Sequence, residues 1–277
     1  MCIRDRYLDH AATTAVSPEV LRAMEPYFSS EFGNPSSMYS IGQAARQAID
    51  TARSRCAAVL GCRDSEVVFT SGGTESDNAA LLGVPLAQVA EGRHVVTTAI
   101  EHHAVLHAGD LLKELGFEVD FIRPQRDGIV NPESIGQALR PDTSLVSVIL
   151  ANNETGVIQP IADIADVVRK MGERFGRKIS MHTDAVQAPG SIPVKVDELG
   201  VDLLSLSAHK FNGPKGVGIL YLRRNTPFRP TQLGGGQERE RRAGTENVAA
   251  IVGTVSYTHL RAHETEADLV CRLLLEK

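Results

Sequence analysis

Residues 67–76 read Val-Val-Phe-Thr-Ser-Gly-Gly-Thr-Glu-Ser, and the change of character within them is the clearest structural signal in the chain. The apolar and β-branched residues 67–70 predict a strand. The two glycines and the hydroxyl residues after them predict a loop, and the acidic residue that follows suits the first turn of a helix. A strand that leads directly into a helix is a building unit of α/β sheets.

On both sides of this segment the chain alternates between strand and helix patterns. Further β-rich runs occur at residues 95–97, 119–122, 145–150, 178–182, 203–206 and 217–222. Helical periodicity occurs at residues 41–60, 104–115 and 161–175, and Ser17-Pro18-Glu19 has the pattern of a helix start. Gly61 is placed to end the helix over residues 41–60. We therefore predict an α/β fold with a mostly parallel sheet flanked by helices.

Composition narrows the class of protein. The 277 residues are 42% apolar, which is enough for a buried core. With 29 basic and 34 acidic residues the net charge is −5, so nothing favours nucleic acid as a partner. The sequence has no apolar run of about 18 residues, and we predict no helix that spans a membrane. Four cysteines without CxxC spacing favour a reducing cytoplasm.

Four segments carry candidate chemistry, and in an α/β fold each would lie in a loop at a strand end, where ligands bind. Residues 70–76 could hold an anion, because glycines admit close backbone approach and a helix N-terminus attracts negative charge. The same residues also fit an ordinary capped helix start. In residues 99–105 the paired histidines could stack on a ring or bind a metal. His103 and His107 have helical ligand spacing but no third ligand nearby, so we predict no metal site.

The other two segments carry an acid and an amine. Asp184 follows an apolar strand and could pair with a protonated ring nitrogen, although it could equally form a turn. Lys210 lies among Ser, His, Gly and Pro just past a strand, where shielding would favour an amine nucleophile. The alternative for a loop lysine is full solvation, which we expect for Lys215.

The four segments taken together point to a cofactor more specifically than any one of them does. Pyridoxal 5′-phosphate (PLP) requires a lysine for covalent attachment, an acid at its pyridine nitrogen, a phosphate cradle and a group that holds the ring. Each requirement is met once, in a separate strand-end loop. We therefore predict PLP as the cofactor. Nucleotide binding is not expected, because residues 213–216 lack the GxxxxGK[ST] spacing.

The order of the motifs resembles that of the cysteine desulfurases of the NifS/IscS branch, which are class-V aminotransferases of PLP fold type I. The segments that carry the resemblance are residues 7–14, 33–37, 71–76, 101–102, 152–156, 184–187, 207–210, 234–238 and 242–245. The resemblance implies a large PLP-binding domain over residues 7–254 and a homodimer. It also implies conversion of L-cysteine to L-alanine, with the sulfur passed as a persulfide on an enzyme cysteine to sulfur-acceptor or scaffold proteins of iron–sulfur or thiolation pathways.

Residue roles follow from the resemblance, motif by motif. Lys210 would form the Schiff base, and His102 would stack on the ring and assist proton transfer. Asp184 would pair with the pyridine nitrogen, and Gln187 would lie near the ring hydroxyl. Asn153 would lie beside cofactor and substrate. The residues implied to hold phosphate, the last of them on the other subunit's cofactor, are Gly73, Thr74, Ser207, His209 and Thr245.

The sequence also departs from the family. The family's sulfur-accepting cysteine lies in a mobile Ser/Gly-rich loop after the Gly-Gly-Gly-Gln-Glu segment, and an arginine for the substrate carboxylate follows; neither motif is found here. Cys56 lies on an apolar helical stripe and Cys62 directly after it, so we expect both to be structural. Cys271 lacks the loop's surroundings, and we assign no catalytic cysteine.

Two further expectations concern the ends and the alternatives. Residues 1–6 and 255–277 do not resemble the family and are expected to be non-native, with the small C-terminal domain largely missing. A selenocysteine lyase, a cysteine sulfinate desulfinase or another class-V aminotransferase would share the cofactor residues. A PLP-binding fragment without turnover is a further hypothesis.

Overall fold

A computed structural model describes residues 7–261, and the elements named below lie within that range. Seven strands form one sheet in the order β1-β7-β6-β5-β4-β2-β3. Their bounds are β1 Val67–Thr70, β2 His94–Thr98, β3 Glu118–Ile122, β4 Thr143–Ser147, β5 Ser180–Asp184, β6 Leu203–Ser207 and β7 Gly218–Leu222. Strand β7 runs antiparallel to both of its neighbours, and the other pairs are parallel. The prediction of a mostly parallel sheet is confirmed.

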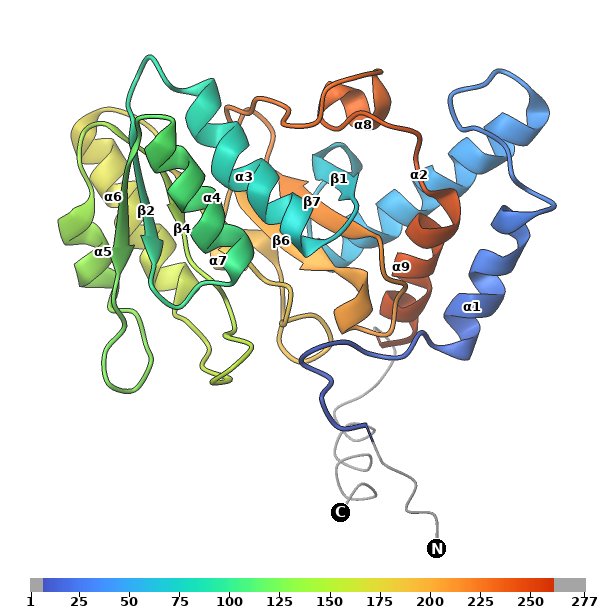
Figure 1. The fold of residues 1–277 in the computed structure, drawn as a ribbon, viewed down its shortest axis with the longest axis horizontal. Helices are drawn as coiled ribbons and strands as arrows, with labels where there is room; N and C mark the ends of the chain where they lie inside the picture. Colours follow the sequence, from blue (N-terminus) through green and yellow to red (C-terminus); the bar gives the residue numbers. More distant parts are fainter. Residues whose placement is uncertain (1–6, 262–277) are drawn as a thin grey trace, which may run out of the picture.

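Helices cover both faces of this sheet (Figure 1). Their bounds are α1 Pro18–Met24, α2 Ser40–Leu60, α3 Gly73–Ala87, α4 His103–Glu114, α5 Pro132–Ala138, α6 Ile161–Phe175, α7 Val196–Leu199, α8 Gln237–Glu240 and α9 Val248–Arg261. Short 3-10 turns, labelled η, lie at η1 Glu25–Phe28, η2 Asp64–Glu66 and η3 Ala208–Lys210. Helix α6 spans residues 161–175, as its apolar periodicity predicts.

Alternation along the strands divides the core into two layers. Val67 and Phe69 of β1 belong to a buried cluster with α2, α6 and α9, whereas Val68 between them belongs to a cluster with α3 and α4. Val95 and Val96 of β2 divide in the same way. Successive side chains of a strand point to opposite faces, so each strand contributes to both layers.

Local signals set the ends of two helices as the sequence predicts. The hydroxyl of Ser17 accepts a hydrogen bond from the backbone N–H of Val20 and caps α1. Gly61 ends α2 in the left-handed conformation, with φ 72°, which costs glycine little. These caps fix where α1 and α2 begin and end around the sheet.

One strand is shorter than its apolar run. The sequence predicts a strand over residues 145–150, but β4 ends at Ser147. The backbone N–H groups of Val148 and Leu150 still donate to the carbonyls of His182 and Asp184 in β5, at 3.1 and 2.8 Å. The N–H of Ile149 between them donates instead to a carboxylate oxygen of Glu101 at 2.9 Å, so a buried side chain supplies that partner.

The helix α9 runs through the domain boundary that we expected at residue 254. Val255 is buried in the same core cluster as α2 and α6. The expected boundary stays a prediction, and residues 1–6 and 262–277, with Cys2 and Cys271, lie outside the described residues. Within residues 7–261, no helix is both long and apolar enough to cross a membrane.

Candidate functional site

A cavity of about 460 Å³ lies at the carboxyl ends of the parallel strands. Strands β2 and β4 are neighbours, and the chain leaves them in opposite directions across the sheet, toward β3 and toward β5. Such a switch point is where open α/β sheets bind ligands. The lining residues are Asp9, Ala11, Ala12, Gly73, Thr74, Asp77, His102, Ile149, Asn153, Asp184, Val186, Gln187, Ser207, His209 and Lys210.

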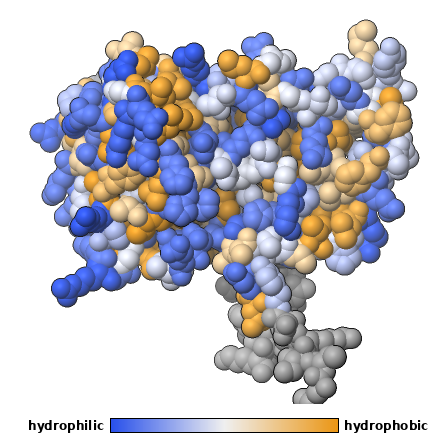
Figure 2. All heavy atoms as spheres, in the orientation of Figure 1, coloured by the Kyte–Doolittle hydropathy of each residue, from blue (hydrophilic) through white to orange (hydrophobic). Residues whose placement is uncertain are grey.

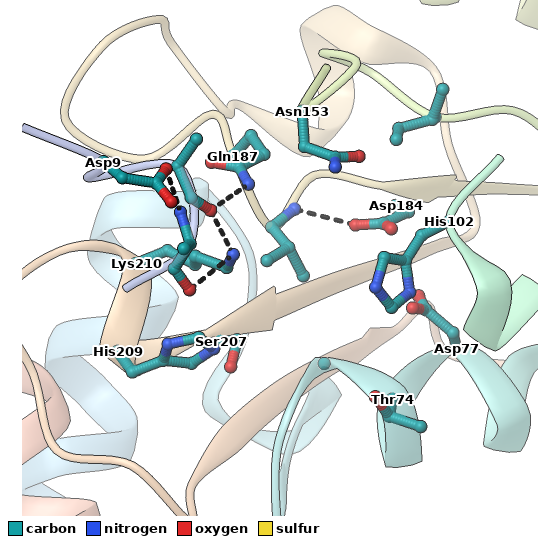
Figure 3. Close-up of a pocket in the computed structure, with 15 residues that line it drawn as sticks. Asp9, Thr74, Asp77, His102, Asn153, Asp184, Gln187, Ser207, His209 and Lys210 are labelled. Atoms are coloured by element: carbon teal, nitrogen blue, oxygen red, sulfur yellow. Dashed lines mark hydrogen bonds between the residues drawn. The ribbon is translucent and has the colours of Figure 1, made fainter. Parts of the chain in front are cut away.

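Nine of the ten residues predicted from sequence for the cofactor line this one cavity. They come from α3, the β2–α4 turn, the loop after β4, the end of β5, the end of β6 and η3. Figure 3 shows Lys210 and His209 on one side of the cavity and Asp184 and His102 on the other. The tenth, Thr245, lies outside and lines a separate cavity of about 220 Å³ with Ser71.

Lys210 differs from Lys215 in the way that a reactive amine requires. Its Nζ donates hydrogen bonds to the backbone carbonyls of Ala11 and Ala12. Partial burial lowers the pKa of Lys210, and the nearby carboxylates of Asp184 and Asp9 only partly oppose that effect. Lys215 is solvent-exposed and is not among the cavity residues. A lowered pKa increases the fraction of free amine, which is the nucleophilic form.

The segment at residues 9–14 closes the cavity against η3. The Gln187 side-chain amide donates to the carbonyl of Ala11 at 2.9 Å. Thr14 donates through both its N–H and its hydroxyl to the carbonyl of His209. The imidazole Nδ1 of His209 lies 3.1 Å from the Thr13 hydroxyl. The sequence singled out residues 7–14 as a motif without giving them a role, and the structure brings them over Lys210.

The floor of the cavity is the N-terminus of α3. A Cβ added to Gly73 would lie 2.8 Å from Cγ2 of Val186, so only glycine leaves this space open. Thr74, Ser207 and His209 add two hydroxyls and an imidazole around the same end. Backbone N–H groups at a helix N-terminus, together with such donors, suit a phosphate group.

Asp184 is the last residue of β5 and is buried. One carboxylate oxygen accepts a hydrogen bond from the N–H of Val186 at 2.9 Å. Burial raises the pKa of Asp184 to about 6, against the opposing effects of that hydrogen bond and of Lys210. A buried carboxylate with one donor has capacity to accept a second, such as a protonated ring nitrogen.

His102 is the N-cap of α4, and its Nδ1 accepts a hydrogen bond from the N–H of Ala104 at 3.1 Å. In the neutral ring the proton therefore lies on Nε2. Burial lowers the pKa of His102, and the positive charges of His103 and Lys210 lower it further. The ring is held in one orientation at the cavity by a backbone contact, as a stacking group needs.

Two buried acids beside the cavity were not predicted. Asp77 lies on α3 and lines the cavity. Glu101 lies under His102, and one of its oxygens accepts from the Thr98 hydroxyl at 2.7 Å and from the Ile149 N–H. Burial raises the pKa of Glu101 to about 8. Glu101 belongs to a motif that the sequence identified and Asp77 directly follows one, but only the packing reveals that they are buried.

Neither described cysteine has the properties of a mobile nucleophile. Cys56 is buried in α2, and Cys62 is partly buried after that helix. Burial raises the pKa of each thiol to about 12. Both therefore remain thiols near neutral pH. Among the described residues, no group of His, Cys, Asp and Glu has the arrangement of a metal site, and the ring of His103 contacts those of His102 and His107.

The cavity fits PLP by its donor set. The chain offers an amine at Lys210, a buried carboxylate at Asp184, an oriented imidazole at His102 and a glycine-lined anion cradle at α3. These are the groups that PLP uses. The side chains of Asn153 and Gln187 complete the rim.

Comparisons with known proteins match the family that the sequence motifs resemble. The sequence profile described as aminotransferase class-V matches residues 6–267. The cysteine desulfurase IscS of Dictyoglomus turgidum is 48% identical over 96% of this chain. A solved structure described as NifS-like protein has a TM-score of 0.89 at 42% identity, covering 93% of this chain and 70% of that one. Another, described as SspA in complex with cysteine, has a TM-score of 0.88 at 38% identity, covering 92% and 72%.

The matches also show how much of a relative this chain covers and which of its residues match the family. This chain covers 66% of the Dictyoglomus turgidum protein, slightly less than two thirds of its length. The profile match continues past residue 254, where the motif resemblance ends.

Proposed function

Because the chain belongs to the aminotransferase class-V family, we propose that residues 7–254 form the PLP-binding domain of a cysteine desulfurase. Class-V aminotransferases and cysteine desulfurases are PLP-dependent. The observation that carries the proposal is that Lys210 and Asp184, from different elements, face one cavity whose floor is a glycine-lined helix N-terminus. The proposed reaction converts L-cysteine to L-alanine and passes the sulfur to an acceptor protein.

Each group in the cavity has a distinct task in this proposal. PLP, when bound, supplies a ring that accepts electron density from the Cα of an amino acid. Asp184 holds a proton on the pyridine nitrogen, because a buried carboxylate favours the protonated partner. Lys210 holds the cofactor and, once its amine is free, moves the proton at Cα. His102 fixes the ring plane and assists that proton transfer.

The remaining predicted residues bind and orient. Thr74, Ser207 and His209 donate to the phosphate together with the backbone at Gly73. Gln187 is already bonded to the carbonyl of Ala11, which places its amide at the rim where the ring hydroxyl would lie. Asn153 would contact the cofactor and the substrate from beside them.

The sulfur step needs a thiolate that neither Cys56 nor Cys62 supplies. A thiol whose pKa is about 12 carries little thiolate at neutral pH, and Cys56 is also sealed in the core. We therefore propose that the accepting cysteine lies outside the described residues. The acceptor would be a sulfur-carrier or scaffold protein, and the setting a reducing cytoplasm.

A homodimer is part of the same proposal. Thr245 is exposed and does not line the cofactor cavity of its own chain. This position is expected for a residue that reaches the phosphate bound by the partner subunit. Large apolar side chains are exposed near α1 and the start of α2, where Figure 2 also shows hydrophobic atoms at the surface. The most exposed of them are Phe28, Phe32, Met38 and Tyr39, at 68%, 70%, 91% and 76%. Such a patch favours burial against a second copy.

Two measurements test the proposed function: deuterium exchange at Cα of the substrate, and formation of the products alanine and sulfide. The purified chain is loaded with PLP and incubated with L-cysteine in deuterated water, and deuterium at Cα, alanine and sulfide are measured. Cα exchange that depends on PLP supports the PLP-binding proposal, and formation of alanine from L-cysteine by the full-length protein supports desulfuration. A chain that folds but binds no PLP would refute both.

A further inference from the structure

Asp77 is a buried carboxyl that hydrogen-bond donors satisfy only in part. It lies in the second turn of α3, is 1% exposed and lines the cavity. Its Oδ1 has no hydrogen-bond partner among the described residues. A carboxylate in that position would keep a full charge out of water with the Ser205 hydroxyl as its side-chain donor and one oxygen unpaired, which is costly. A protonated carboxyl would carry no such charge.

A chain of hydroxyls and one imidazole surrounds Asp77. His182 of β5 is fully buried, with Nδ1 2.8 Å from the Ser147 hydroxyl and Nε2 3.0 Å from the Ser205 hydroxyl. The same Nε2 lies 3.7 Å from Oδ1 of Asp77, too far for a hydrogen bond. Burial lowers the pKa of His182 to about 3. The ring is therefore neutral and supplies no positive charge to Asp77.

The other carboxyl of the cavity is on the same face of the sheet. His182 and Asp184 are two residues apart on β5, so their side chains point to the same side, toward α3. Burial raises the pKa of Asp77, the negative charge of Asp184 raises it further, and a hydrogen bond with the Ser205 hydroxyl only partly opposes these effects. Asp184, in contrast, receives the N–H of Val186 and the field of Lys210. The environment thus favours charge on Asp184 and a proton on Asp77.

The remaining ionisable groups around Asp77 do not change that order. Glu101, from the β2–α4 turn, is a third buried acid and adds to the effect of Asp184. His102, from the same turn, has a lowered pKa and is neutral near pH 7. On α3 itself, Glu75 is ion-paired with Arg242 at 2.8 Å. Strands β4 and β6 contribute uncharged hydroxyls, those of Ser147 and Ser205.

We propose that Asp77 and Asp184 share a single proton, that Asp77 holds it, and that Asp184 therefore carries the only negative charge of the pair. Asp77 is a positioning residue in this view, because it acts on the ring nitrogen through Asp184. Two ionised carboxyls would repel each other and would favour protonation of Asp184, which is the form that cannot hold a pyridine proton. The last step of this inference rests on the proposed PLP function; the proton assignment does not.

The proton assignment is tested on the cofactor-free chain by infrared difference spectroscopy near pH 7. The spectrum of the wild type minus that of Asp77→Asn should contain the carbonyl band of a protonated carboxylic acid. The matched control is Asp50→Asn, because Asp50 is an exposed acid in the interior of a helix, α2. Its difference spectrum should contain only carboxylate bands. Carboxylate bands alone for Asp77→Asn would overturn the proposal.

Stability against pH provides a second measurement on the same variants. A carboxyl whose pKa is raised on folding gives stability at low pH that is lost as the pH rises above about 4, the unfolded value. The Tm of Asp77→Asn relative to wild type should therefore increase steadily from pH 5 to pH 8. In an Asp184→Asn background, the increase caused by Asp77→Asn should be smaller, because the neighbouring charge is gone. A difference independent of pH, or one that falls, contradicts the shared proton.

PLP binding then separates this inference from the proposed function. Asp184→Asn should bind PLP at least tenfold more weakly than the wild type at pH 7. If the wild type binds no PLP, the proposed function fails while the infrared and Tm results still decide the proton. If Asp77→Asn fails to fold, a pH titration of the acid band in Glu101→Gln and in Glu101→Gln with Asp184→Asn replaces it, because Glu101 is itself protonated near pH 7. A band that persists in the double variant supports the proposal, and its loss overturns it.

Discussion

The Nζ of Lys210 donates a hydrogen bond of 3.1 Å to the carbonyl oxygen of Ala12, a residue 198 positions earlier in the chain. The contact connects the N-terminal segment to the loop that carries the candidate nucleophile (Figure 3). It satisfies the ammonium without a carboxylate, so the lysine is not held in a strong ion pair. The amine can therefore be released from backbone carbonyls when a ligand enters, at a modest cost in hydrogen-bond energy.

The first prediction concerns attachment of the cofactor. Borohydride reduction of the PLP-loaded chain, followed by peptide mapping, should place the pyridoxyl group on Lys210. Lys210→Ala should abolish the label, and Lys215→Ala should retain it, because Lys215 is exposed and outside the cavity. A label on Lys215 in the wild type would exclude the assignment.

The second prediction concerns Asp184. Asp184→Asn should slow deuterium exchange at Cα of L-cysteine by about 10²–10³-fold, because an amide cannot hold the pyridine nitrogen protonated. The control is Asp202→Asn: Asp202 is also buried, directly before β6, but it bonds Lys178 and the N–H of Met181 and does not line the cavity. That variant should lose stability and keep the exchange rate per folded molecule. Equal slowing in both variants would point to general damage.

The third prediction is a pH dependence set by His102. The pKa of His102 is lowered, so the neutral ring persists below the ordinary histidine value of about 6.5. The acid limb of Cα exchange should therefore have its midpoint below about 6.5. His103→Gln removes a charge that lowers this pKa, and the midpoint should move upward. His102→Gln should abolish this limb, and an unchanged limb would assign it to another group.

The fourth prediction concerns a buried ion pair that anchors residues 232–245. Arg53 of α2 bonds both carboxylate oxygens of Glu238 at 2.7 and 2.8 Å, and Glu238 also accepts the N–H of Phe69 at 3.0 Å. Arg53→Met leaves a buried carboxylate without its cation and should destabilise the fold by about 3–5 kcal/mol. Arg53→Met with Glu238→Gln should recover part of that loss.

An exposed pair provides the comparison for this prediction. Glu19 and Arg22 are 2.9 Å apart on α1, with both side chains about half or more exposed to water. Glu19→Gln should change the free energy of unfolding by only about 0–1 kcal/mol. Urea denaturation of the three variants measures both effects. A loss below about 1 kcal/mol for Arg53→Met would mean that the segment relaxes without the pair.

The fifth prediction concerns association. If Thr245 reaches the partner's phosphate, PLP occupancy should rise with the dimer fraction as protein concentration increases. Sedimentation velocity, read with the cofactor absorbance, measures both together. Thr245→Ala should weaken PLP binding without moving the monomer–dimer equilibrium, since the residue adds one hydrogen bond and little area. Full occupancy in a clean monomer would contradict a shared site.

The sequence by itself predicted the α/β class, the approximate positions of the seven strands and nine of the residues that line the cavity. Residue patterns with a period of two or 3.6 and short motifs carry that information locally, as at Val67–Thr70, Asp184 and Lys210. The tertiary structure alone decided that Ala12 closes over Lys210, that the N–H of Ile149 bonds Glu101, and that one oxygen of the buried Asp77 carboxyl has no donor. These features depend on segments far apart in the chain and on exclusion of water. Burial changes the pKa of an acid only when the whole fold has removed its solvent, and no local pattern records that.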